Sequence, residues 1–247
     1  MQILELTSTQ WIWIIVCALL VGMSKAGISG LGIFIIPILA LLFGGKSSTG
    51  ILLPMLCIAD VFAVKYYNRH AQWSFLVKLL PWTLVGIGIG VLVGDRISDE
   101  VFKEIMAVII FICLGLMIWQ DTRKRVKLPE TWWFSAIVGL AGGFATMIGN
   151  AAGPIMAVYL LSMHLPKNSY IGTAAWFFLI INFLKLPLHA FIWNTITWPS
   201  LLLDISMTPA IALGAFMGIY IVKKIPEKPY RIFIIVTTGI SAFTLFV

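Results

Sequence analysis

Ten apolar segments, separated by short polar stretches, are the feature of this sequence that most restricts its fold. They lie near residues 11–27, 33–43, 48–66, 77–95, 101–120, 132–145, 150–162, 168–191, 200–222 and 230–246. Most are about 17–25 residues long, the length that a helix needs to cross a bilayer. Charged residues make up 11% of the chain, whereas soluble domains carry about 25%. We therefore expect an all-α polytopic integral membrane protein that contacts the lipid bilayer.

Charge and cysteine usage exclude several other classes of protein. The net charge is +7, but the chain leaves too little water-exposed surface for the basic face of a nucleic-acid-binding protein. The three cysteines (Cys17, Cys57 and Cys113) lie inside apolar segments, without the spacing of a metal site. We expect no metal, no other cofactor, no nucleic-acid partner and no enzymatic activity. The sequence leaves open whether the chain forms a homo-oligomer.

The two halves of the chain resemble each other. Gly22, Gly32 and Pro37 match Gly139, Gly149 and Pro154 at a constant offset of 117, and Gly86 and Gly90 match Gly214 and Gly218 at an offset of 128. We interpret these matches as an internal duplication, with a first transmembrane repeat at 1–120, a linker at 121–131 and a second repeat at 132–247. Because each repeat has an odd number of segments, five, the two repeats should have inverted topology in the membrane.

Basic residues support this alternation. With the linker in the cytoplasm, the cytoplasmic loops hold eleven of the seventeen basic residues: Arg69, Lys78, Arg123, Lys124, Arg125, Lys127, Lys167, Lys223, Lys224, Lys228 and Arg231. The outer loops hold only Lys46, Arg96 and Lys103, as the positive-inside rule requires. We expect a multi-pass protein of the plasma or inner membrane with both termini external. The number of full crossings stays between six and ten, since the short segments 33–43 and 150–162 fit either re-entrant hairpins or crossings.

Two glycine-rich interruptions are the candidate binding elements. The first runs from Lys25 to Gly32, and the second from Gly142 to Pro154. Broken helices in transporters aim their positive N-terminal ends at anions near the membrane midplane. The residues that we expect to form such a cradle are Ser29, Gly30, Gly32, Thr146, Gly149 and Asn150. The alternative is that these glycines only allow helices to pack closely.

Polar residues inside apolar segments are functional candidates, because burying them is costly. We expect Lys25 and Lys185 to balance the charge of an anion, although Lys25 could instead extend to the membrane interface. Asp60 and Asn182 occupy matching repeat positions, 122 residues apart, and are predicted to face each other. We assign Asn182 to substrate binding and Asp60 to coupling or gating, with an interhelical hydrogen bond as their alternative.

Other candidates receive structural roles. We expect Lys65 and His189 at the membrane interface and Asp204 at a helix N-terminus, where its charge favours the helix dipole. Eight tryptophans at segment ends fit interfacial anchors: 11, 13, 73, 119, 132, 133, 193 and 198.

Two motif-like stretches suggest other functions. The stretch 40–47 lacks the first glycine of a phosphate-binding loop, so we reject ATP binding there. The sequence Gly27-Ile28-Ser29-Gly30 fits the G-x-S-G of rhomboid-like intramembrane proteases, with His189 as the base, but such proteases are not built from two inverted halves. A channel or facilitator for small neutral solutes is the stronger alternative.

Taken in order, these motifs resemble the sulfite exporter TauE/SafE family over residues 11–246. The resemblance rests on Gly22…Gly27-x-Ser29-Gly30-x-Gly32…Pro37, on Gly139…Ile148-Gly149-Asn150…Gly153-Pro154, on Asn182-x-x-Lys185, and on the Ile97…Phe102 and Ile225…Tyr230 pairs. It implies a secondary transporter that exports small sulfur-containing or organic anions, such as sulfite, sulfoacetate or related sulfonates. Alternating access of one site between the repeats would carry the anion.

Overall fold

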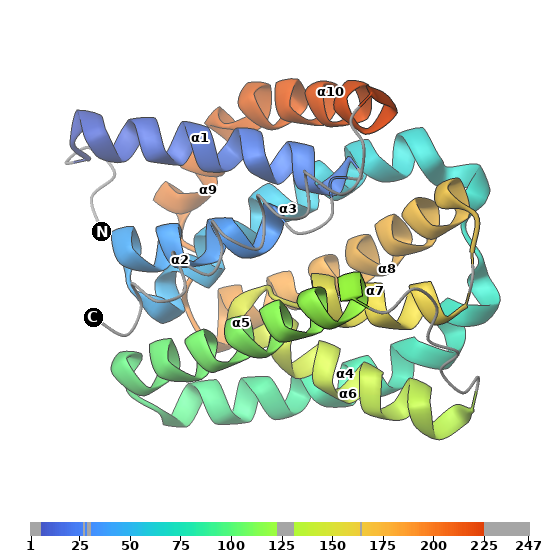
Figure 1. The fold of residues 1–247 in the computed structure, drawn as a ribbon. Helices are drawn as coiled ribbons and strands as arrows, with labels where there is room; N and C mark the ends of the chain where they lie inside the picture. The colour runs from blue at the N-terminus through green and yellow to red at the C-terminus, as the bar shows by residue number, and fades with distance from the viewer. Residues whose placement is uncertain (1–5, 27, 29–30, 123–130, 164, 225–247) are drawn as a thin grey trace.

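The described part of the chain folds into helices joined by short turns. The computed structural model describes residues 6–26, 28, 31–122, 131–163 and 165–224, and these residues contain no strand (Figure 1). The helices are α1 (Ser8–Lys25), α2 (Leu31–Phe43), α3 (Gly45–Tyr67), η2 (Asn68–His70), α4 (Trp73–Arg96), α5 (Asp99–Thr122), α6 (Trp132–Gly149), α7 (Gly153–Ser162), α8 (Lys167–Pro187), η3 (Leu188–Ile192), α9 (Trp198–Ser206) and α10 (Thr208–Lys224). The all-helical fold expected from the sequence is confirmed.

Nine of the ten predicted segments correspond to these helices, and the tenth, 230–246, lies outside the described residues. One prediction needs correction: the segment 200–222 is two helices, α9 and α10, which meet at Met207 with a bend of 44°. Pro209 explains the break, because it has no N–H to bond the Ile205 carbonyl and its ring hinders a continuous helix. A proline also precedes the turn of π-helix η3, which follows Pro187 at the end of α8.

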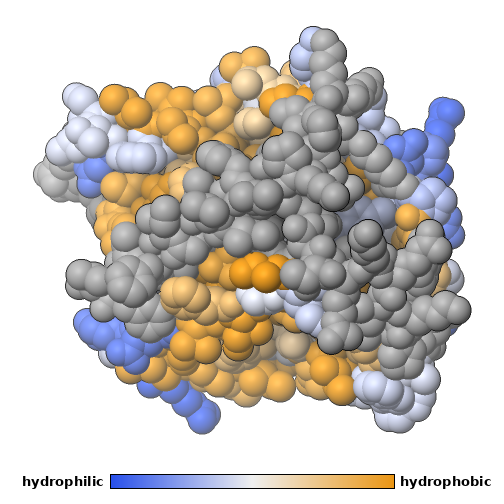
Figure 2. Space-filling model, in the orientation of Figure 1, coloured by the Kyte–Doolittle hydropathy of each residue, from blue (hydrophilic) through white to orange (hydrophobic). Residues whose placement is uncertain are grey.

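The described helices are suited to a bilayer. Five spans are long and apolar enough to cross it (α1, α3, α4, α6 and Asn168–Ile192), and α9 with α10 makes a sixth if the bent pair is one span. Large apolar side chains such as Val77 and Phe216 are more than 60% exposed. Figure 2 shows that much of the described surface on the visible face is apolar, with hydrophilic residues toward its left and right margins. Lipid is the solvent that fits such a surface.

Helices α3 and α8 pack against each other in antiparallel fashion. A Cβ atom at Gly172 would meet the Tyr67 carbonyl, and one at Gly50 would meet Thr195, so the numbers rise along α8 as they fall along α3. Most of α3 is buried. These two helices carry the polar residues of the candidate site.

Glycines allow two very close helix crossings on either side of this pair. At the crossing of α1 and α10, a Cβ on Gly22 would overlap the Ile211 carbonyl, and one on Gly214 would overlap the Leu19 carbonyl. At the crossing of α4 and α6, a Cβ on Gly86 would overlap the Leu140 carbonyl, and one on Gly139 would lie 2.6 Å from the Trp82 side chain. Gly22 matches Gly139, and Gly86 matches Gly214, in the proposed duplication. The two crossings are thus built from matched residues.

The N-terminus of α3 is held by a carboxylate from another helix. Asp99, at the start of α5, accepts hydrogen bonds from the backbone N–H groups of Gly45 (3.1 Å) and Lys46 (2.8 Å). Gly44, which precedes them, has a φ of +87°, a conformation that glycine adopts without strain. An anion at a helix N-terminus satisfies free N–H groups and the helix dipole together.

Candidate functional site

A polar stripe on α8 is the starting point of the site. Asn182, Lys185 and His189 are spaced by three and four residues and therefore lie on one face of the helix. All three are buried, with at most 1% of each residue exposed. Buried polar groups need partners, particularly inside a membrane. The partners of these three side chains define three layers of the site.

In the first layer, Lys185 forms hydrogen bonds with residues of the second glycine-rich interruption. Its ammonium nitrogen Nζ donates to the Thr146 carbonyl (2.8 Å), to Thr146 Oγ1 (3.0 Å) and to Asn150 Oδ1 (2.6 Å). Asn150 ends α6 in the left-handed conformation, with a φ of 54°. Its Nδ2 donates to the Thr49 carbonyl of α3, at 3.2 Å. Three of the predicted residues, Thr146, Asn150 and Lys185, are therefore in direct contact.

The charge of Lys185 is not matched by a carboxylate. An ammonium has three donors, and here they reach two carbonyl-type oxygens and one hydroxyl, all of them neutral. Among the described residues, Lys185 takes part in no ion pair. A fully buried cation with neutral partners makes the interior locally attractive to an anion.

The second layer has the opposite arrangement, because its lysine is paired. Lys25 Nζ lies 2.9 Å from Asp60 Oδ1, and Asn182 Nδ2 donates to Asp60 Oδ2 at 2.6 Å. The Lys25 ammonium also lies 4.0 Å from the centre of the Phe178 ring, as in a cation–π contact. Asp60 and Asn182 thus face each other, as their matching repeat positions predicted. Lys25 neutralises Asp60 instead of extending to the interface.

The structure describes the whole of the second glycine-rich interruption but only part of the first. Gly27, Ser29 and Gly30 lie outside the described residues. Gly32 lies in the first turn of α2, where a Cβ would come 3.2 Å from Ser24 Oγ. Gly149 ends α6, and a Cβ there would come 3.2 Å from Met106. Both described glycines are thus in tight surroundings.

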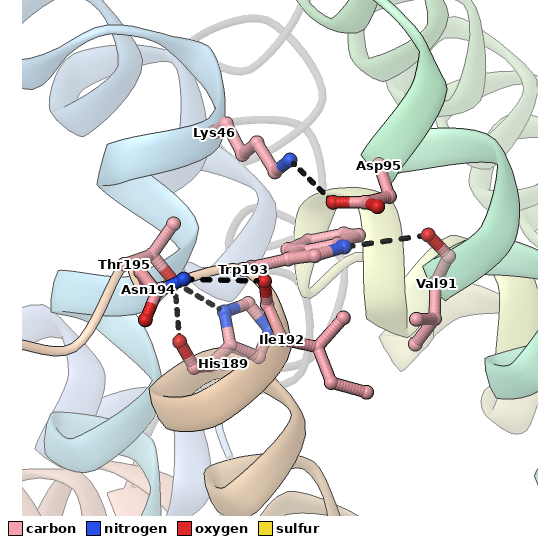
Figure 3. Close-up of polar contacts among 8 residues, drawn as sticks. All are labelled: Lys46, Val91, Asp95, His189, Ile192, Trp193, Asn194 and Thr195. Carbon is pink, nitrogen blue, oxygen red and sulfur yellow. Dashed lines mark hydrogen bonds and ion pairs between the residues drawn. The ribbon is translucent and has the colours of Figure 1, made fainter.

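The third layer lies at the π-helical turn η3, where His189 is fully buried (Figure 3). His189 Nδ1 is 2.9 Å from Thr195 Oγ1, and its ring packs edge-on against Trp193, 4.9 Å between centroids. Trp193 is 6% exposed and donates from Nε1 to the Val91 carbonyl of α4, at 3.3 Å. Both rings are buried in the protein, and their position at the membrane interface stays a prediction. The π turn and the loop after it fold both rings inward.

An ion pair covers Trp193 at the end of the molecule where α3 begins and α4 ends (Figure 3). Lys46 Nζ lies 3.6 Å from Asp95 Oδ1 and 5.0 Å from the centre of the Trp193 ring. Gly94 makes room for this ring, because a Cβ there would overlap it. Trp193 thus lies between His189 on one side and the Lys46 ammonium on the other.

Sequence reasoning did not identify Trp193, Thr195 or Asp95 as parts of the site. A signal was present for Trp193: it follows a proline and a histidine in an apolar segment, and its loop carries no charge. The Thr49 carbonyl could not be identified from the sequence, because every residue has a backbone carbonyl. No cluster of His, Cys, Asp and Glu suited to a metal ion occurs among the described residues.

The family model for "Sulfite exporter TauE/SafE" matches residues 14–245, nearly the whole chain. A search of curated proteins found no match.

Proposed function

The chain belongs to the sulfite exporter TauE/SafE family of membrane transporters, and from this premise we propose that it exports small sulfur-containing or organic anions such as sulfite, sulfoacetate or related sulfonates. The substrate class fits the charge of the interior. A small oxyanion or sulfonate carries several acceptor oxygens, and the site offers an ammonium, a hydroxyl and an amide as donors.

The observation that carries this proposal is the state of Lys185. Its buried ammonium contacts only neutral oxygens among the described residues, whereas the neighbouring Lys25 is matched by Asp60. An incoming anion would replace Thr146 and Asn150 as the partner of Lys185 and gain a charge-assisted hydrogen bond. Thr146 Oγ1 and Asn150 Nδ2 would then donate to the remaining oxygens of the anion.

The breaks would complete the cradle. The N-terminus of α7 follows Asn150 after two residues and would add backbone N–H groups on one side. Ser29, Gly30 and Gly32 of the first break would form the opposite side, with Gly149 keeping the second break compact. Asn182 would orient Asp60, and the Lys25–Asp60 pair would act as a coupling or gating element next to the anion.

Alternating access is the mechanism that we propose for release. The end covered by Trp193 and the Lys46–Asp95 pair is the external end in the topology with a cytoplasmic linker, 121–131, and external termini. The matched glycine crossings of α1 with α10 and of α4 with α6 support two inverted repeats, 1–120 and 132–247, that rock against each other. An anion that leaves an inside-negative cell gains about 2.3 kcal/mol per charge per 100 mV, so the potential can drive export.

Flux in proteoliposomes tests the proposal. Vesicles are loaded with sulfite, thiosulfate, sulfoacetate, acetate or urea, and a potential of each sign is imposed. We expect potential-dependent movement of a sulfur oxyanion or sulfonate, and its loss in Lys185→Gln, which removes the charge but keeps a polar side chain with N–H donors. Movement of urea with no anion flux would contradict the proposal and support a channel for neutral solutes.

A matched control separates loss of charge in general from loss of the site. Lys78 is an exposed lysine of α4. Lys78→Gln changes the net charge by the same amount, and we expect it to leave flux unchanged. Equal loss of flux in both variants would show that overall charge, and not the buried ammonium, controls transport.

A further inference from the structure

A second buried carboxyl group lies outside the layers described above. Asp204 on α9 is fully buried, and neither of its side-chain oxygens has a hydrogen-bond partner among the described residues. The expectation that it lies at a helix N-terminus was wrong, because the segment is broken. Asp204 is in the last turn of α9, whose N-terminus is capped by Thr197 and Ser200. A carboxylate in that last turn faces the unfavourable end of the helix dipole.

Comparison with Asp60 indicates the protonation state of Asp204 that its surroundings favour. Both carboxyl groups are fully buried, but Asp60 has Lys25 and Asn182 as partners, whereas Asp204 has neither a cation nor a hydrogen-bond donor among the described residues. An ionised carboxylate without partners is very costly in a low-dielectric interior. The neutral acid costs much less, so this position holds a proton as long as it stays closed.

The elements packed around Asp204 supply no charge. From α3, the Cys57 thiol is the titratable group that interacts with it electrostatically. From α10, the described titratable side chain is Tyr220, which is 59% exposed. Burial, and not a charged partner, is thus what the described residues impose on Asp204. Among these residues, no neighbouring carboxylate would take the proton from Asp204, and no neighbouring cation would stabilise its ionised form.

Asp204 lies next to the break between α9 and α10. The break at Met207 lies three residues after Asp204, and the Met207 N–H already bends back to the carbonyls of Leu203 and Asp204. Breaks inside membrane spans occur where the backbone is buried in protein or lines a cavity, and they are common pivots of transporters. A change of the 44° bend would move Asp204 relative to α3.

We propose that Asp204 is a proton-binding site that holds one proton in the closed state and exchanges it with water when the break between α9 and α10 moves. The carboxylic acid releases a proton to water and becomes a carboxylate, and the same group takes up a proton before the site closes again. Proton exchange would thereby be coupled to the transport cycle. The coupling rests on the proposed transport function, whereas the proton site does not.

Infrared spectroscopy of the protein in lipid bilayers tests the proton site without any substrate. We expect the carbonyl stretch of a protonated carboxyl group at neutral pH, and its disappearance in Asp204→Asn, the closest neutral substitute. The band should persist in Asp60→Asn and in Glu104→Gln, where an exposed carboxyl group is removed. Asp204→Glu should keep a shifted band. A band that persists unchanged in Asp204→Asn would overturn the proton site.

Flux measurements test the coupling. Sulfoacetate efflux is followed at a fixed membrane potential while a pH gradient of each sign is imposed. We expect the wild-type rate to respond to the gradient and Asp204→Asn to lose this response, while Glu104→Gln keeps it. An equal response in Asp204→Asn would overturn the coupling. Absence of any anion flux in the wild type would overturn the proposed function and the coupling together, and the infrared result would still decide the proton site.

Discussion

Lys185 Nζ lies 2.6 Å from Asn150 Oδ1, and this contact joins the last turn of α8 to the break between α6 and α7. The two residues are 35 positions apart in the sequence, yet the contact is short enough for a strong charge-assisted hydrogen bond. The acceptor is a neutral amide, so the positive charge of Lys185 is oriented without being neutralised. This combination suits a site that must bind an anion and then release it.

Replacing Asn150 by aspartate tests this point directly. Asn150→Asp has almost the same shape, but it places a carboxylate next to the Lys185 ammonium and neutralises the charge internally. We expect anion flux to fall by at least about tenfold, since an added interaction of 1.4 kcal/mol changes binding by that factor. Asn150→Asp also loses the hydrogen bond from Nδ2 to the Thr49 carbonyl, but the new ion pair with Lys185 should offset this loss and keep the protein folded. Flux equal to the wild type, with an unchanged melting temperature, would contradict the role of this charge.

The Lys25–Asp60 pair predicts a pattern of stability. Removal of one partner from a buried ion pair leaves an uncompensated charge and costs about 3–5 kcal/mol. We therefore expect Lys25→Met to lower the midpoint of thermal unfolding strongly, and the double variant Lys25→Met/Asp60→Asn to recover most of the loss. The midpoint is measured in detergent or nanodiscs. A double variant no more stable than the single one would show that the pair is not coupled.

Several parts of this arrangement could be predicted from the sequence. Nine of the predicted apolar segments coincide with helices of the structure, although one of them is two helices, because lipid requires apolar side chains along the whole length of a span. The duplication predicted that Asp60 would face Asn182. The position of Lys185 inside an apolar segment identified it as a candidate site residue. These predictions depend on the length of apolar segments, on the polarity of single residues and on the internal repeat, all of which can be read from one sequence.

Other parts could not be predicted, because they depend on contacts between distant segments. For Trp193 and His189, the distance from a segment end predicted a position at the interface, but it could not show that a π turn after Pro187 carries both rings inward. Asp204 was assigned to a helix N-terminus because the break at Met207 was not foreseen. Pro209 was a readable signal for that break. The role of the Thr49 carbonyl as a hydrogen-bond acceptor and the pairing of helices at the glycine crossings could be seen only in the structure.

Trp193 predicts how the covered end opens. On a background in which Cys17, Cys57 and Cys113 are replaced by alanine, His189→Cys is exposed to a membrane-impermeant thiol reagent. We expect slow labelling while Trp193 is present and labelling several-fold faster when Trp193→Ala removes the ring. The reagent is added from each side in turn, which also tests the topology. Equal rates with and without Trp193 would show that this ring does not close the path.

The glycine crossings predict a matched loss of stability. Gly86→Val and Gly214→Val each place a side chain where a backbone carbonyl of the neighbouring helix lies. Overpacking of this kind costs about 1–3 kcal/mol, or prevents folding when the backbone cannot move. Gly115→Val, on α5, is the control, because a Cβ at Gly115 meets no atom within 4 Å. We expect both crossing variants to unfold at lower temperature than this control.

Asp99 predicts a dependence of stability on pH. Partial burial acts to raise the pKa of Asp99, but the backbone N–H groups of Lys46 and Gly45, together with Lys103, outweigh it and hold this pKa below its ordinary value. A carboxyl group with a lowered folded-state pKa stabilises the protein fully above its unfolded-state pKa, and this contribution is lost as the pH falls through the folded-state pKa.

Asp99→Asn removes the charge that holds the N-terminus of α3, so the wild type should be the more stable protein at neutral pH. The difference between the two unfolding midpoints should shrink as the pH falls below about 4, where an ordinary aspartate becomes protonated. Glu104→Gln on the same helix is the control and should show no such difference at either pH. A gap between wild type and Asp99→Asn that stays constant down to acidic pH would mean that shape, and not charge, anchors α3.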